Sequence, residues 1–388
     1  MHKRFITVHI AAVMPLGNLN RDQNGLPKSG FDGGVQRGRI SAQALKRAAR
    51  VAYRDLGHDE SLRTRLAVDV ALQEATAYAE EQALAFDAKA GRAAISKVIK
   101  ALTNSKPETS AKQTDEDGGE SKPETDSENI IFISRAELTT LAHAVVNAQH
   151  GGDVVSVESS LIRDASSPSL DIAAFGRMFA AQADLGTHAA IAVSHAVTTH
   201  QMTLIADYFT AVEDVKQEHA GAAHIGTSYF TSGVYYRTFT VDIDQLARSW
   251  SGISGEGARK ALGDLTRCLV RALPSGKATN TNPYTTPFLV LAETQDFRTA
   301  YEFDAPVQPG EGEGNDYDID RGGFKTGTTK RIAEQRSRAT SFDPDNFGPA
   351  VTWLEKPETV SFDDGVTSVP DLAAIVDFVC DQALADVR

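Results

Sequence analysis

The stretch Arg4-Phe5-Ile6-Thr7-Val8-His9-Ile10, near the start of the chain, has the pattern of a β-strand. Aliphatic residues at the even positions alternate with Phe5, Thr7 and His9, and no glycine or proline interrupts them. Glycine and proline are then frequent from Pro15 to Gly38, which predicts a long loop. A loop of this length in a compact domain is usually functional or disordered.

Helices are predicted behind this loop. Ser41 has the side chain of an N-cap, and the helix after it is expected from about Ala42 to Leu56. The next hundred residues are also predicted to be helical, with a capping box formed by Ser134 and Glu137. Between these helices, residues 104–129 hold three basic and eight acidic residues but only one aliphatic and no aromatic side chain. We expect a disordered surface insertion there, because nothing can be buried to offset the cost of ordering.

Three further strands are predicted, at Ala189–Val193, Val234–Ile243 and Phe288–Leu291. A helix with leucines at 262, 265 and 269 precedes the last strand, and an amphipathic helix ends the chain. This order is that of a βαββαβ core interrupted twice, so we expect an α+β fold. The segment Gly322–Gly327 is rich in glycine but lacks the Walker spacing, and it is predicted to be a surface loop.

Charge is distributed unevenly along the 388 residues. The whole chain has a formal net charge of −13, which alone argues against a nucleic-acid partner. The first 50 residues, however, hold nine basic and two acidic residues, a balance of +7 that leaves −20 for the rest. A basic, glycine-rich loop that leads into a helix suits a chain of phosphates, because glycines permit close approach and free helix N–H groups accept an anion.

Other features exclude several classes of protein. No run of 18 apolar residues is present, so no membrane-spanning helix and no membrane partner are expected. The two cysteines, Cys268 and Cys380, predict reduced thiols in a cytoplasmic protein. No P-loop, H-E-x-x-H or G-x-S-x-G motif occurs, so nothing argues for an enzyme. His195 and His200 lack a third ligand nearby and are expected to be structural, so we predict no metal and no cofactor.

Several blocks of the chain resemble one protein family. The first lies in the basic segment and consists of Asn18-Leu19-Asn20-Arg21-Asp22, Lys28, Gly33-Gly34, Arg37, Arg39-Ile40-Ser41, Gln43 and Leu45-Lys46-Arg47. Further blocks follow in the family's order, at Gly176-Arg177-Met178, Ser194–Gln201, Asp207–Asp214, Gly226-Thr227 and Ser232–Arg237. On these residues the chain resembles the CasC backbone subunits of Cascade, the type I-E CRISPR surveillance complex.

The resemblance implies a hand-shaped protein with a modified RRM-like (ferredoxin-like) palm. The palm would comprise residues 1–58, 186–199 and 234–388, the last with the C-terminal tail. A helical fingers insertion would occupy residues 59–185, and a protruding thumb residues 200–233. The aromatic signature of ordinary RRM domains is not evident in the strands, so base stacking on the sheet face is not expected.

The resemblance also implies roles for individual residues. Guide phosphates would be bound by the basic segment, through Arg21, Lys28, Arg37, Arg39, Ser41, Gln43, Lys46, Arg47 and Arg50. Met178 would be an apolar wedge between bases, the alternative being a core methionine. In the thumb, Phe209, Thr210 and Val212 would fold over a displaced nucleotide, the alternative being a hydrophobic contact between subunits.

By this resemblance the protein is a non-catalytic RNA-binding subunit of a ribonucleoprotein in antiviral defence. It would form a homo-oligomeric filament along the spacer of a CRISPR RNA (crRNA) and present the bases for pairing with target DNA. Its partners would be neighbouring copies and the large, small, 5′-handle-binding and RNA-processing subunits of Cascade. Two alternatives remain: a crRNA-processing endoribonuclease with an RRM-like fold that uses His195 or His200, and a small-molecule enzyme that binds a nucleotide phosphate on the basic segment.

Overall fold

A computed structural model describes most of the chain. It covers residues 3–58, 61–103, 130–151, 165–179, 181–212, 222–310, 323–358, 360–363 and 365–385. The insertion predicted at 104–129 lies outside the described residues, so its predicted disorder is not tested.

The centre of the molecule is a mixed sheet built around the predicted first strand. β1 (Phe5–Gly17) pairs antiparallel with β9 (Ala222–Asp242) on one side and with β10 (Leu289–Gln295) on the other. β6 (Ile191–Val193) and β7 (Ala196–Thr198) pair antiparallel with the far side of β9. The order β10-β1-β9-β6/β7 is that of a βαββαβ core. The predicted α+β, RRM-like fold is therefore confirmed.

Additional strands extend this core at both edges. Beyond β10 lie β11 (Phe347–Leu354), which is antiparallel to it, and β12 (Val366–Ser368), which is parallel to β11. Beyond β7 lie β3 (Val35–Ile40) and β2 (Ser29–Asp32). Residues 29–32 and 35–40 of the basic N-terminal segment therefore belong to the sheet.

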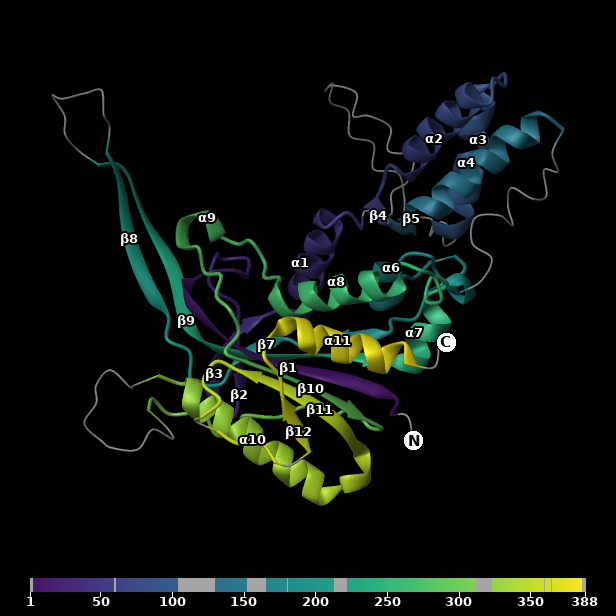
Figure 1. Ribbon diagram of the computed structural model, residues 1–388. Coiled ribbons are helices and arrows are strands. Elements are labelled where there is room, and N and C mark those ends of the chain that lie inside the picture. Colours follow the sequence, from purple (N-terminus) through teal and green to yellow (C-terminus); the bar gives the residue numbers. More distant parts are fainter. Residues whose placement is uncertain are drawn as a thin grey trace.

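Helices cover both faces of the sheet (Figure 1). On one face, α1 (Ala42–Asp55), α8 (Ala258–Arg271) and α11 (Leu372–Ala383) bury the even residues of β1, among them Ile6, Val8 and Ile10. On the other face lies α10 (Lys325–Phe342), which buries Ile332 against Leu291 and Ala350. The face that an ordinary RRM leaves open to RNA is thus covered here.

A buried polar network ties α10 to the sheet. The Oε1 atom of Glu293 on β10 accepts from His9 Nε2 at 3.0 Å and from Tyr301 Oη at 2.7 Å. Its Oε2 atom accepts from Arg336 Nε on α10 at 2.9 Å. Burial opposes the ionisation of Glu293, but the hydrogen bonds of His9 and Tyr301 and the charge of Arg336 outweigh it and lower the pKa of the carboxyl.

A separate helical lobe follows α1 in the chain and stands away from the sheet (Figure 1). It consists of α2 (Ala67–Glu81), α3 (Ala88–Thr103) and α4 (Arg135–Gln149), with the small sheet of β4 (Ser61–Thr64) and β5 (Ile131–Ser134) at its base. The lobe has its own apolar cluster, which includes Ile95, Ile99, Leu138 and Leu141. The predicted capping box is present: Ser134 Oγ accepts from Glu137 N, and Ser134 N donates to the Glu137 carboxylate.

A long hairpin projects from the opposite end of the sheet (Figure 1). It is formed by β8 (Ile205–Val212) and the first part of β9, which pair antiparallel from Ile205 and Phe230 to Val212 and Ala222. Short elements complete the fold: α6 (Leu170–Phe175), α7 (Ile243–Ser249), α9 (Ala278–Thr281) and the 3-10 turns Ala183–Leu185 and Pro344–Asn346.

Three local predictions were wrong. The segment from Pro15 to Gly38 is not a single loop, because Gly33 and Gly34 adopt φ of +58° and +73° and form a two-residue hairpin turn between β2 and β3. The Gly322–Gly327 loop ends early, since α10 begins at Lys325. The strand predicted to end at Ile243 ends at Asp242, whose side chain accepts from Gln245 N and so caps α7.

Candidate nucleic-acid interface

The N-terminus of α1 is assembled from three distant parts of the chain. Ser41 is the N-cap, as predicted, and its Oγ accepts from Ala44 N at 3.4 Å. The Ser41 N–H donates to Asn20 Oδ1 at 2.9 Å, and the Ala42 N–H donates to His195 Nδ1 at 2.8 Å. Gln43 is exposed beside these bonds. The start of the helix is therefore held in place by two side chains from outside it.

His195 acts here as a neutral acceptor. Burial, followed by the positive charges of Arg39 and Lys28, lowers the pKa of its imidazole. The backbone holds those two cations close together, since Arg39 N donates to Lys28 O and Lys28 N donates to Asn20 O, each at 2.8 Å. Lys28 and Arg39 therefore lie next to the start of α1. Arg21 is exposed in the same segment, and its backbone forms an isolated antiparallel β-bridge with Pro27.

Three basic side chains of α1, which we call the basic track, follow along the helix: Lys46, Arg47 and Arg50. The Nζ atom of Lys46 lies 5.9 Å from the ring centroid of Phe175, and the guanidinium carbon of Arg50 lies 5.1 Å from that of Phe132. Burial lowers the pKa of both Lys46 and Arg50. Within the described residues none of the three forms an ion pair, so their charges remain available to an anion.

Met178 is presented by an anchored loop close to the track. Its side chain is 83% exposed, so the alternative of a core methionine is wrong. The preceding Arg177 is buried, and its NH1 donates to both carboxylate oxygens of Glu137 at 2.7 Å. Gly176 adopts φ of +78°, and any larger residue at this position would place its Cβ 3.0 Å from the backbone oxygen of Thr187. Phe175, whose ring centroid lies 5.9 Å from Lys46 Nζ, is three residues before Met178 in the chain.

Arg37 is placed differently from the other basic residues of the segment. Only 1% of its surface is exposed. Its guanidinium donates to the carbonyl oxygens of Asp32 at 3.2 Å, of Thr198 at 3.0 Å and of Phe303. The phosphate contact predicted for Arg37 is not supported by this placement, because its donors satisfy buried carbonyl groups and hold the β2–β3 hairpin against the body.

The predicted thumb residues lie on the projecting hairpin, apart from α1 (Figure 1). Phe209 is 44% exposed, and its ring lies over Gly226 on the paired strand, where a Cβ would come 2.5 Å from the ring. Thr210 is also exposed, and Val212 belongs to β8, but its side chain lies outside the described residues. The structure therefore divides the predicted residues between two surfaces.

The two histidines named as chemical candidates differ in their surroundings. His200 is buried, accepts from Val234 N at Nε2 and bonds Gln201 O through Nδ1, so both ring nitrogens are engaged. In the described parts of the chain no group of three His, Cys, Asp or Glu side chains could hold a metal ion. No helix among the same residues is long and apolar enough to cross a membrane.

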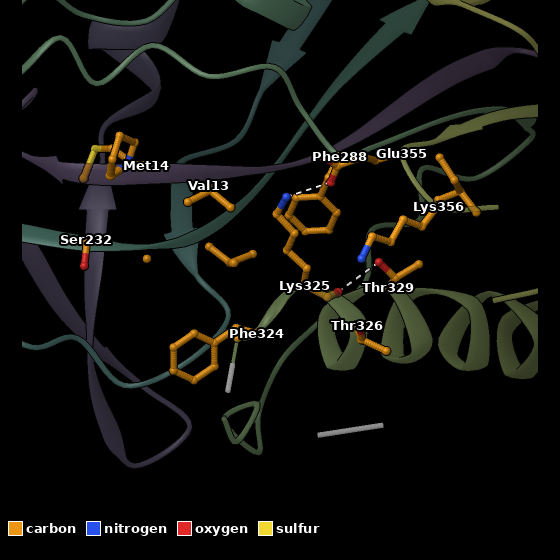
Figure 2. A pocket seen from close by; sticks show the side chains of 15 residues that line it. Val13, Met14, Ser232, Phe288, Phe324, Lys325, Thr326, Thr329, Glu355 and Lys356 are labelled. Atoms are coloured by element: carbon orange, nitrogen blue, oxygen red, sulfur yellow. Dashed lines mark hydrogen bonds and ion pairs between the residues drawn. The ribbon is translucent and has the colours of Figure 1, made fainter. Parts of the chain in front are cut away.

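A cavity of about 580 Å³, shown in Figure 2, is lined by residues of β9 that follow the projecting hairpin and by no residue of the basic track. It is bounded by β1, β9 and the start of α10, with Val13, Phe288 and Phe324 among its lining residues. Lys325 enters it but donates to the Glu355 carboxylate at 2.7 Å. None of the predicted RNA-binding residues lines this cavity, so it is not part of the candidate interface.

Two features of the interface were not predicted from the sequence. The aromatic rings under Lys46 and Arg50 come from Phe175 and Phe132, which are more than 80 residues away in the chain. His195 was expected to be structural, but its partner was not predicted, because the hydrogen bond is donated by the backbone N–H of Ala42 and not by a side chain. Both features depend on long-range packing, of α6 and β5 against α1 and of β7 beside β3, which a single sequence does not specify.

Comparison with solved structures supports this fold. A chain of one structure, named "CRISPR RNA-guided surveillance complex, pre-nicking", is 22% identical with a TM-score of 0.73, and the match covers 98% of this chain and 100% of that one. A chain of a second, named "CRISPR RNA-guided surveillance complex", is 18% identical with a TM-score of 0.68, covering 97% and 99%. No curated protein matches the chain. The sequence model described as "CT1975-like protein" matches residues 6–325, and the chain therefore belongs to the family of CT1975-like proteins.

Proposed function

We propose that this protein is a crRNA-binding backbone subunit of a type I-E Cascade complex. It oligomerises along the guide spacer, grips the guide phosphates and leaves the bases free to pair with target DNA. The observation that carries the proposal is the basic track of α1: Lys46 and Arg50 lie near aromatic rings, and none of the three cations forms an ion pair within the described residues. Cations without carboxylate partners beside aromatic rings suit a single-stranded polyanion.

The similar folds add support. Both solved structures belong to complexes named as CRISPR RNA-guided surveillance complexes, and each match spans nearly the whole of both chains. A complex of this kind supplies the partners of the proposal: neighbouring copies, the other Cascade subunits, crRNA and, through the guide, target DNA. We place the assembly in the cytoplasm, where guide and subunits would meet.

We further propose that the subunit is not catalytic. A crRNA-processing endoribonuclease would need a free general base, and the candidate side chains are His195 and His200. His195 Nδ1 is engaged by the Ala42 N–H, and both ring nitrogens of His200 are bonded to the backbone. These bonds favour positioning roles for both histidines.

Co-expression with a CRISPR array and the other subunits tests the proposal. We expect a large species by size-exclusion chromatography and electron microscopy, with guide-length RNA that survives nuclease treatment. A clean monomer without nucleic acid would contradict the proposal. Cleavage of precursor RNA by the isolated protein, lost in the His195→Ala or His200→Ala variant, would support the endoribonuclease instead.

A further inference from the structure

The positive surface of α1 continues past the basic track. Arg47, Arg50 and Arg54 are spaced at i, i+3 and i+7, so they line one side of the helix. Arg54 is exposed, and Asp55 is the only acidic residue of this helix. Like charges at these spacings lower the stability of a helix. The needs of folding therefore do not explain why three arginines line this side of α1.

A further arginine meets this stripe from the base of the helical lobe. Arg63 on β4 stands directly opposite Phe132 on β5 in the antiparallel register, so their side chains share one face of the small sheet. Phe132 is also the ring that lies 5.1 Å under the Arg50 guanidinium. Phe132 therefore links Arg50 on the palm side to Arg63 on the lobe side, and Arg63 is exposed.

Two carboxylates of the neighbouring elements have hydrogen-bond partners of their own, although the charge of one of them, Asp171, still acts on Arg50. Asp171 is buried and accepts hydrogen bonds from the hydroxyls of Ser61 and Ser169. Glu137 is engaged by Arg177. Within the described residues neither Arg54 nor Arg63 forms an ion pair.

Several other surface arginines have acidic partners. Arg4 pairs with Asp242, Arg92 with Asp69, and Arg259 with Asp377 and Asp381. In a chain with 52 acidic and 39 basic residues, several arginines that lie along one seam and form no ion pair within the described residues suit a ligand that brings negative charge.

We propose that Arg54 and Arg63 form an additional phosphate-binding subsite, at the seam between α1 and the helical lobe, for the sugar–phosphate backbone of the guide RNA. The subsite extends the basic track, and it rests on the proposed function. Arg50 and Arg54 are about 6 Å apart along the helix axis, close to the separation of neighbouring phosphates in an extended strand. The planar guanidinium is suited to bidentate contact with phosphate oxygens.

Binding of single-stranded RNA by the full-length chain, measured over a range of salt concentrations, tests the subsite. In the Arg54→Gln/Arg63→Gln variant we expect the slope of log affinity against log salt to fall by about 1.4, about 0.7 for each lost phosphate contact. Because the counterion-release contribution vanishes at 1 M salt, this slope change corresponds to a loss of affinity of about 25-fold at 0.1 M salt, equal for unrelated RNA sequences. The Arg54→Lys/Arg63→Lys variant keeps both charges and should restore the slope.

The matched control is Arg248→Gln/Arg338→Gln, which removes two exposed arginines on α7 and α10 and should leave the slope unchanged. Circular dichroism of each variant checks that the fold is retained. An unchanged slope in the Arg54→Gln/Arg63→Gln variant, with normal binding by the wild type, would overturn the subsite alone. Absence of RNA binding by the wild type would overturn the proposed function and the subsite together. A variant complex that keeps its RNA but loses affinity for target DNA would overturn the assignment to the guide.

Discussion

The Nδ1 atom of His195 accepts a hydrogen bond from the backbone N–H of Ala42 at 2.8 Å, across 153 residues of chain. One side chain at the start of β7 thus satisfies a free N–H of α1 and fixes the helix against the sheet. The basic track begins one turn later, so its position depends on this bond. His195 is a positioning residue in this arrangement.

Replacing His195 by alanine should destabilise the protein by about 1 kcal/mol at pH 7, as loss of a helix cap does. The pKa of His195 is lowered in the folded state, so the unfolded chain binds a proton more readily. The contribution of the bond is therefore present above about pH 6.5 and is lost as the pH falls below that value. Urea denaturation at pH 7.5 and pH 5.5 measures both effects. The control is His188→Ala, which removes another exposed imidazole. Equal losses of stability in the two variants at pH 7.5 would contradict the capping role.

Reversing the charges of the basic track should abolish retention of guide RNA. Lys46 and Arg50 carry positive charge over apolar rings, and glutamate at both positions would repel phosphates there. We expect Lys46→Glu/Arg50→Glu to purify without nuclease-protected RNA while its circular dichroism spectrum is unchanged. Arg248→Glu/Arg338→Glu makes the same change of charge elsewhere and should keep its RNA. Normal RNA content in the Lys46→Glu/Arg50→Glu variant would refute the phosphate assignment.

Local structural features were predicted well from the sequence. The alternation of residues in β1, the N-cap at Ser41 and the capping box at Ser134 each depend on neighbouring residues, and the structure confirms all three. The Asp32-Gly33-Gly34 turn was missed, although paired glycines between two strand-like runs are a hairpin signal. α10 could not be predicted from periodicity, because it buries threonines and Arg336 and has few apolar residues.

The candidate site was predictable only in part, because the roles of its cations depend on contacts with distant parts of the chain. Arg37 and Arg39 are two residues apart in one glycine-rich segment, and composition alone gives them the same role. The structure separates them, because Thr198 and Phe303, which are more than 150 residues away, place their carbonyl groups around the Arg37 guanidinium. Such long-range contacts decide whether a cation is a ligand-binding group or a structural one.

Arg37→Lys should therefore affect stability far more than RNA binding. Lysine keeps the charge but cannot reach three carbonyl oxygens, and the buried acceptors left without partners should cost about 2–4 kcal/mol. The midpoint of urea denaturation measures this loss. RNA affinity and salt slope of the folded variant should match the wild type. Arg39→Lys is the control and should change stability by less than about 0.5 kcal/mol. A reduced salt slope in Arg37→Lys would return Arg37 to the phosphate contacts.

The network around Glu293 makes a prediction about pH. Arg336→Met removes the cation from a buried pair and should destabilise the protein by about 3–5 kcal/mol at pH 7, because the charge of Glu293 is then uncompensated. In the wild type the pKa of Glu293 is lowered, so its contribution is present above about pH 4.5 and is lost as the pH falls. Without Arg336 that pKa should rise, and protonation of Glu293 should relieve part of the penalty.

The difference in unfolding free energy between wild type and Arg336→Met should therefore be smaller at pH 5 than at pH 7. The Glu293→Gln/Arg336→Met double variant lacks the buried carboxylate and should be more stable than Arg336→Met alone at pH 7. Arg338→Met, two residues along α10 with an exposed side chain, is the matched control and should show no such dependence on pH. An equal penalty for Arg336→Met at both pH values would mean that Arg336 holds α10 through packing and through Asp363, and that its charge does not stabilise Glu293.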